Sequence, residues 1–67
     1  MRQWLKNLRL QKAYTQQEVA EGAGISQNFY SSIENGERRP SPRVAQRLGA
    51  FLGFHWTLFY QDEQRTG

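Results

Sequence analysis

The chain has no cysteine, a single histidine and no cluster of carboxylates among its 67 residues. Without cysteine it can form neither a disulfide framework nor a thiolate metal site. A chain of this length is also too short to enclose a catalytic pocket around one histidine. We therefore expect a protein that is not an enzyme and that has no metal, no cofactor and no small-molecule substrate.

Long apolar segments are also missing. The longest apolar run is too short to span a membrane, and no signal-peptide core is present. Together with the lack of cysteine, this predicts a cytoplasmic protein with no membrane partner. No useful stretch alternates apolar and polar residues, and no repeat occurs, so the sequence predicts a single all-α domain.

Charge of both signs is present, with a modest basic excess. Nine Lys or Arg against six Asp or Glu give a formal charge of +3 and a sequence pI near 9.8. In so small a chain this excess favours a polyanionic partner such as nucleic acid. The alternative is a surface with a slight basic bias and no such partner.

Capping signals divide the chain into short helices. Thr15 and Glu18 have the spacing of a capping box, in which each side chain bonds the other residue's amide. Ser26 is a suitable N-cap, and Ser41 precedes Pro42, which suits the first position of a helix. The patterns predict five helices, over residues 2–12, 16–23, 27–35, 42–52 and 54–60.

The first of these helices has an apolar stripe with one unexpected member. Leu5 and Leu8 define the stripe, and Met1 would extend it by one turn. Arg2 is predicted on the solvated side. Arg9 instead lies close to the apolar stripe, so we expect it to have a partner there.

Residues 16–36 have the pattern of two helices joined by a sharp turn. Gly24 permits the turn and Ala20 permits close approach of the two helices. Phe29 falls off the apolar stripe, and either packs at the edge of the preceding helix or lies partly exposed near a partner surface. The inward positions of the second helix are Ile25, Tyr30 and Ile33. Its outward positions are short and polar: Gln27, Asn28, Ser31 and Ser32.

The strings TQQEVA, GIS and IENGERRPSP, at these spacings, resemble the Cro/C1-type, or Xre, family of phage and bacterial repressors. The resemblance covers roughly Leu5 to Tyr60. It implies a compact five-helix repressor-like domain over residues 1–60, with the helix-turn-helix in its second and third helices and a polar tail over residues 61–67. It also implies a transcriptional regulator, a repressor, that binds a near-palindromic operator in double-stranded DNA as a homodimer.

The resemblance further implies roles for individual residues. An ion pair between Arg9 and Glu34 would tie the first helix to the third. The base-contacting positions would be Gln27, Asn28, Ser32 and Ser31. The phosphate-contacting positions would be Gln16, Gln17, Asn35, Arg38, Arg39 and Arg43. Ordinary solvation is the alternative for Gln27 and Asn28, and for the loop residues Asn35, Arg38 and Arg39. Arg43 opposes the dipole of its own helix, which indicates either a phosphate contact or no role.

The C-terminal part departs from the family pattern, because His55 stands where a Ser or Asp cap is usual. This part is rich in aromatic residues, and related repressors use it to form dimers. We therefore expect Phe54, Trp56 and Tyr60 at a dimer interface, although the aromatics could instead close a small core. The rival function is a protein-interaction module on the same fold, such as an antitoxin or an anti-repressor.

Overall fold

The structure is a computed structural model, and it describes residues 1–61. Four helices follow one another: α1 (Gln3–Gln11), α2 (Gln16–Ala23), α3 (Gln27–Asn35) and α4 (Pro42–Leu52). A fifth helical segment begins at Leu58 and continues through residue 61, and residues 1–61 contain no strand. The predicted all-α fold with five helices is therefore confirmed. The predicted polar tail lies, apart from Gln61, outside the described residues.

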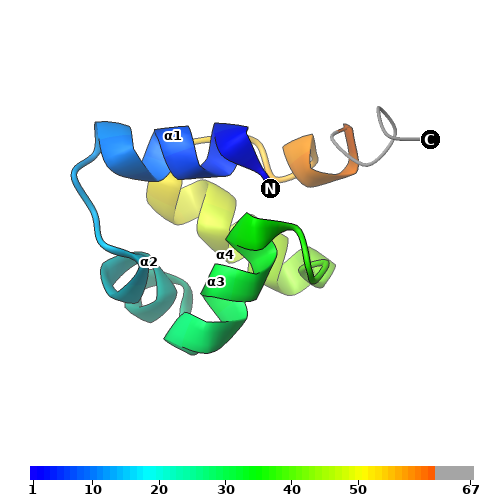
Figure 1. The fold of residues 1–67 in the computed structure, drawn as a ribbon. Helices are drawn as coiled ribbons and strands as arrows, with labels where there is room; N and C mark the ends of the chain where they lie inside the picture. Colours follow the sequence, from blue (N-terminus) through cyan, green and yellow to red (C-terminus); the bar gives the residue numbers. More distant parts are fainter. Residues whose placement is uncertain (62–67) are drawn as a thin grey trace.

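In Figure 1, α1 crosses one side of the molecule, and α2 and α3 lie together on the other side. Helix α4 packs behind them, chiefly against α2. The N-terminus lies near the end of α3 and near the C-terminal helical segment. Parts of the chain that are far apart in sequence thus meet at the C-terminal end of α3.

Side-chain caps fix the start of three helices. The Thr15 hydroxyl accepts from the Glu18 amide, and the Glu18 carboxylate accepts from the Thr15 amide, so the predicted capping box is present. Ser26 caps α3 and Ser41 caps α4 in the same way. Each such cap contributes about 0.5–2 kcal/mol, which explains why the sequence alone predicts these boundaries.

The link between α1 and α2 contains a conformation that the sequence did not indicate. Ala13 has a φ of 59°, the left-handed region that usually takes glycine. Its amide donates to the Leu10 carbonyl, and the Tyr14 amide donates to the Arg9 carbonyl. These two bonds satisfy the Arg9 and Leu10 carbonyls in the last turn of α1, which opposes the ~1–2 kcal/mol that an alanine loses in this conformation.

The core lies between the helices and contains residues from each of them. Its aromatic part is a cluster in which Trp4 meets Phe54 and Phe59 edge to face, with ring centroids 5.2 and 5.1 Å apart. Gly49 permits the chain to fold back here, because a Cβ on it would lie 2.6 Å from the Phe54 carbonyl oxygen. The fully buried hydrophobic residues are Leu5, Val19, Ala20, Ala23, Tyr30, Ile33, Ala45, Leu48, Leu52 and Phe59.

The fifth helical segment begins later than predicted. Phe54 lies in a bend and Trp56 in a turn, whereas the sequence placed both in the helix. The cause is local: the His55 Nδ1 atom lies 2.7 Å from the Thr57 hydroxyl and accepts from the Thr57 amide at 3.4 Å. His55 therefore acts as a cap, and regular helix begins only after it.

Candidate nucleic-acid interface

Helix α3 has two chemically different faces. Tyr30, Ile33 and Glu34 are buried against the rest of the domain. Gln27 and Asn28, in the first turn, are exposed, and Ser31 and Ser32 are half-buried. Because Gly24 ends α2 in a left-handed conformation and Ser26 caps α3, the first turn of α3 projects from the surface.

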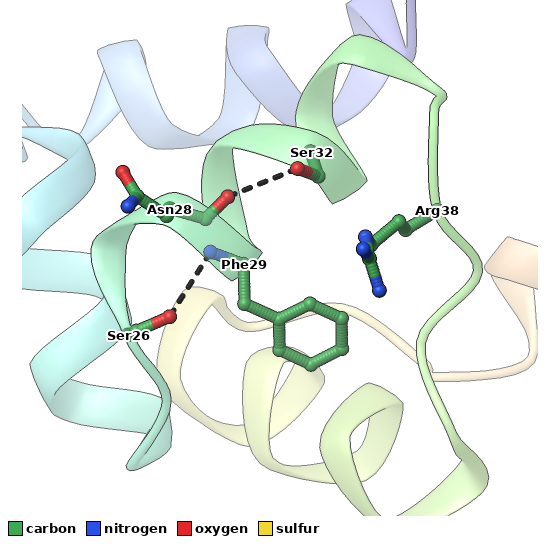
Figure 2. Close-up of a pocket in the computed structure, with 5 residues that line it drawn as sticks. All are labelled: Ser26, Asn28, Phe29, Ser32 and Arg38. Atoms are coloured by element: carbon green, nitrogen blue, oxygen red, sulfur yellow. Dashed lines mark hydrogen bonds between the residues drawn. The ribbon is translucent and has the colours of Figure 1, made fainter.

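Ser32 is held by its own helix. Its hydroxyl donates to the Asn28 carbonyl at 3.0 Å (Figure 2). While this bond lasts, the hydroxyl can only accept from a ligand. In the major groove such a donor is the N6 amino group of adenine or the N4 amino group of cytosine.

An open hollow of about 340 Å³ lies between the outer face of α3 and the loop that follows it. Figure 2 shows the Phe29 ring pointing away from the Asn28 amide, with the Arg38 side chain reaching toward the ring from the loop. The residues that line the hollow are Ser26, Asn28, Phe29, Ser32 and Arg38. The structure thus brings together three of the expected contacts, Asn28, Ser32 and Arg38.

The other expected phosphate contacts lie at the ends of three helices and in the loop between α3 and α4. Gln16 and Gln17 are the first residues of α2, and Gln17 is exposed. Asn35 is the exposed last residue of α3. Arg39 is exposed in the loop, and Arg43 is exposed in the first turn of α4. None of these five lines the hollow.

A buried ion pair holds α3 from behind. The Arg9 Nε atom donates to Glu34 Oε2 at 2.9 Å, and a second nitrogen of the same guanidinium donates to Oε1 at 3.1 Å. The Tyr30 hydroxyl also donates to Glu34 Oε2, at 2.7 Å. Arg9 therefore has the partner that its position on α1 requires, and α1 is tied to α3.

The protonation states of this group follow from its surroundings. Burial acts to raise the pKa of Glu34, but hydrogen bonds from Arg9, Tyr30 and Gln16 outweigh it, so the pKa lies below its ordinary value. Burial, followed by the hydrogen bond to Glu34, raises the pKa of Tyr30. The hydrogen bond with Glu34 likewise raises the pKa of Arg9. Glu34 is therefore ionised, and Tyr30 is a neutral donor, at neutral pH.

Gln16 links this buried group to the surface. Its side-chain nitrogen donates to Glu34 Oε1 at 3.2 Å, which braces α2 against α3. A glutamine amide has two N–H donors, so the second one stays available. The bracing is thus observed, and the phosphate contact of Gln16 stays a prediction.

The positions of Arg2 and Met1 contradict the prediction from sequence, which placed Arg2 on the solvated side of the first helix and Met1 on its apolar stripe. Arg2 is only 7 % exposed, and Met1 is 67 % exposed. The Arg2 amide donates to the Glu34 carbonyl at 2.8 Å, and its guanidinium donates to the carbonyls of Ile33 and Arg38. A cation is stabilised at a helix C-terminus, and this one also holds the following loop.

The sequence does not predict the burial of Arg2, because that burial depends on carbonyl groups at the end of another helix, α3. Its guanidinium also lies over the Phe59 ring, 5.5 Å from the ring centroid. The one signal in the sequence is an arginine at the start of α1, where the helix dipole disfavours a cation. Arg2 joins α3, the loop and the C-terminal segment at one point.

The three aromatics expected at a dimer interface are all half-buried in one protomer. Phe54 packs inward against Trp4 and Phe59. Trp56 instead contacts Tyr60 edge to face at 5.7 Å and stacks on the exposed His55 at 6.3 Å. Phe54 thus belongs largely to the aromatic part of the core, and Trp56, which also packs against the core, pairs with Tyr60 beside it.

Two other kinds of site were sought in the described residues. No group of three or more His, Asp or Glu side chains could hold a metal ion there. No helix within residues 1–61 is both long and apolar enough to cross a membrane.

Helices α2 and α3, joined by the turn at Gly24, have a buried back and a polar front, which defines a helix-turn-helix domain. A family model described as helix-turn-helix matches residues 5–59. The chain therefore belongs to the helix-turn-helix family of Cro/C1 type.

Curated relatives carry regulator names. The chain is 52 % identical over 62 residues to the HTH-type transcriptional regulator YqaF of Bacillus subtilis (strain 168), covering 92 % of this chain and 82 % of that protein. It is 33 % identical over 49 residues to the cryptic phage CTXphi transcriptional repressor RstR of Vibrio cholerae, covering 73 % of this chain and 44 % of RstR.

A third relative is the HTH-type transcriptional regulator y4dJ of Sinorhizobium fredii (strain NBRC 101917 / NGR234). It is 41 % identical over 46 residues, which are 69 % of this chain and 60 % of that protein. No solved structure gives a significant match. The chain is a DNA-binding regulator of the helix-turn-helix class, and these relatives are named as regulators rather than enzymes.

Proposed function

We propose that the chain is a sequence-specific repressor that binds a near-palindromic operator in double-stranded DNA as a homodimer. One observation carries the proposal: a short polar helix face, beside an arginine-bearing loop, is held from behind by a buried ion pair. The first turn of α3 would enter the major groove, as in other helix-turn-helix domains. One relative is named a repressor, which supports negative regulation.

Base reading would fall to Gln27 and Asn28, with Ser32 and Ser31 beside them. Gln27 and Asn28 are exposed in the first turn of α3, where helix-turn-helix proteins contact base edges. An amide side chain suits adenine, because it can accept from N6 and donate to N7 at once. Ser32 contributes an acceptor one turn further along α3.

Phosphate contacts would position α3 without reading sequence. The loop after α3 has two exposed arginines, Arg38 and Arg39, and Arg2 fixes the Arg38 backbone. Within residues 1–61, no side chain forms an ion pair with the Arg38 guanidinium, so that charge is open to a phosphate. The other proposed contacts are Gln16, Gln17, Asn35 and Arg43.

The size of one protomer supports the proposed dimer. One protomer is 31 Å in its longest dimension and has one recognition helix. Two recognition helices must be about 34–36 Å apart to enter successive major grooves on one side of the duplex. We propose that the half-buried Trp56, Tyr60 and Phe54 lie near the two-fold axis. We further propose that the protein acts in the cytoplasm.

Selection of binding sites from random duplex DNA tests the proposal, followed by sedimentation of the protein with the selected duplex. The expected result is an enriched motif with two related half-sites and two protomers per duplex. Trp56→Ala should reduce cooperative binding to the two half-sites. Enrichment of no motif would contradict sequence-specific binding and favour the protein-interaction module. One protomer per full site at saturation would contradict the homodimer.

A further inference from the structure

Phe29 is an aromatic residue on an otherwise polar reading face. It lies one residue after Asn28, is half-buried, and forms part of the lining of the hollow beside Arg38. In Figure 2 the ring lies across this hollow, between α3 and the loop. The ring packs partly against the core, but it also leaves an apolar surface where the proposed DNA interface is otherwise polar.

The chemistry around the ring restricts what can fill the hollow. Polar groups of Ser26, Asn28 and Ser32 surround it, and the Arg38 guanidinium stands at its edge. An amino or carbonyl group of a base placed on the ring would lose its hydrogen bonds to water, at a cost in free energy. The C5-methyl group of thymine loses none, and it is the one methyl group that an unmodified base pair presents in the major groove.

Arg38 adds a second restriction, on what lies beside the bound base. Arg38 comes from the loop side of the hollow, so a base edge placed between α3 and the loop would bring the backbone of its own strand close to the Arg38 guanidinium. A guanidinium suits a phosphate there. The hollow, at about 340 Å³, has room for a methyl group with part of the attached nucleotide.

We propose that this hollow binds the C5-methyl group of one thymine in each half-site, with Phe29 as the methyl contact and Arg38 on the flanking phosphate. Phe29 is thereby a specificity-determining residue. This inference rests on the proposed sequence-specific DNA binding, and adds to it one base and one residue that recognises it.

The test uses the full chain and the duplex selected from random DNA. Each thymine is replaced in turn by deoxyuridine, which removes the methyl group and changes no hydrogen-bonding group. At one thymine per half-site we expect affinity to fall about fourfold, the amount that burial of one methyl-sized group contributes. 5-Bromouracil at that position should restore affinity, because its bromine is close to a methyl group in size.

The second half of the test assigns the methyl group to Phe29. With Phe29→Ala, thymine and deoxyuridine at that position should bind equally well. Phe29→Leu keeps an apolar contact and protects the fold, and should retain a reduced preference for thymine. The matched control is Phe51→Leu, because Phe51 is also half-buried but stacks on Tyr14 and does not line the hollow. This control should retain the full preference.

The outcomes separate this inference from the proposed function. Specific binding that ignores every thymine methyl group would overturn the inference alone. So would a preference for thymine that persists unchanged in both Phe29→Ala and Phe29→Leu, since the methyl group would then contact another residue. Enrichment of no sequence at all would overturn the proposed function, and the inference with it.

Discussion

The two faces of α3 differ in how their polar groups are used. On the inner face, Glu34 accepts hydrogen bonds from Arg9, Tyr30 and Gln16, so its carboxylate is satisfied inside the protein. On the outer face, Gln27 and Asn28 are exposed to solvent. Polar groups that form hydrogen bonds within the chain hold the helix in place. Polar groups exposed to solvent can exchange their hydrogen bonds with water for hydrogen bonds with a ligand, at a low cost in free energy. The comparison implies that changes on the inner face alter stability and that changes on the outer face alter DNA recognition.

The largest expected effect lies on the inner face. Glu34→Ala should leave the Arg9 guanidinium without its buried partner and destabilise the fold by about 3–5 kcal/mol. Chemical denaturation would measure this loss. The control is Glu37→Ala, which removes the same charge from an exposed loop residue and should change stability by no more than about 0.5 kcal/mol. A melting temperature for Glu34→Ala within a degree or two of wild type would show that the pair stabilises little.

Acid should weaken the same face. The pKa of Glu34 in the folded chain lies below its ordinary value of 4.5, so the unfolded chain binds this proton more readily. The stabilisation is fully present above pH 4.5 and is lost as pH falls through the folded pKa. Unfolding curves recorded across this range should show an acid-dependent loss in wild type that is smaller in Glu34→Gln. Equal losses in the two proteins would assign the effect to other carboxylates.

On the outer face, the expected loss is one of recognition. Gln27→Ala and Asn28→Ala should each weaken binding to the selected site by about 1–3 kcal/mol, and binding to random duplex DNA much less. Both residues are exposed, so unfolding stability should change by no more than about 0.5 kcal/mol. Titrations of each variant with the selected duplex and with random duplex DNA, at one salt concentration, would measure the two affinities. Equal weakening on the two duplexes would show that the residue does not read bases.

The loop should give the smallest effect, and one without sequence preference. Arg38→Ala and Arg39→Ala should weaken binding to every duplex and lower the slope of log affinity against log salt by about one unit per lost phosphate contact. Lys6→Ala, which removes a charge from α1, serves as the control. An unchanged slope in either arginine variant would remove that residue from the interface.

The sequence predicted local features better than contacts between distant segments. The bounds of α2, α3 and α4 follow from caps and turn glycines a few residues apart, and they agree with the structure. The burial of Arg2 and the delayed start of the fifth helical segment were not predicted. Arg2 is held by carbonyls more than thirty residues away, and the C-terminal segment is shaped by the unusual cap at His55.

In the candidate site, too, local features could be predicted from the sequence and contacts between distant segments could not. The outward positions of α3 could be read from helical periodicity, because α3 is regular and its caps are clear. The hollow could not be predicted from the sequence, because it forms only where the loop after α3 brings Arg38 beside Phe29. The position of that loop depends in turn on Arg2.

The most direct test of the central claim, that the outer face of α3 reads bases and the loop only positions it, compares binding motifs. Site selection from random duplex DNA would be run with wild type, Asn28→Ala and Arg38→Ala. Asn28→Ala should relax the preference at one position in each half-site while leaving the rest of the motif intact. Arg38→Ala should bind more weakly and select the wild-type motif. An unchanged motif with Asn28→Ala, together with an altered one for Arg38→Ala, would contradict the account.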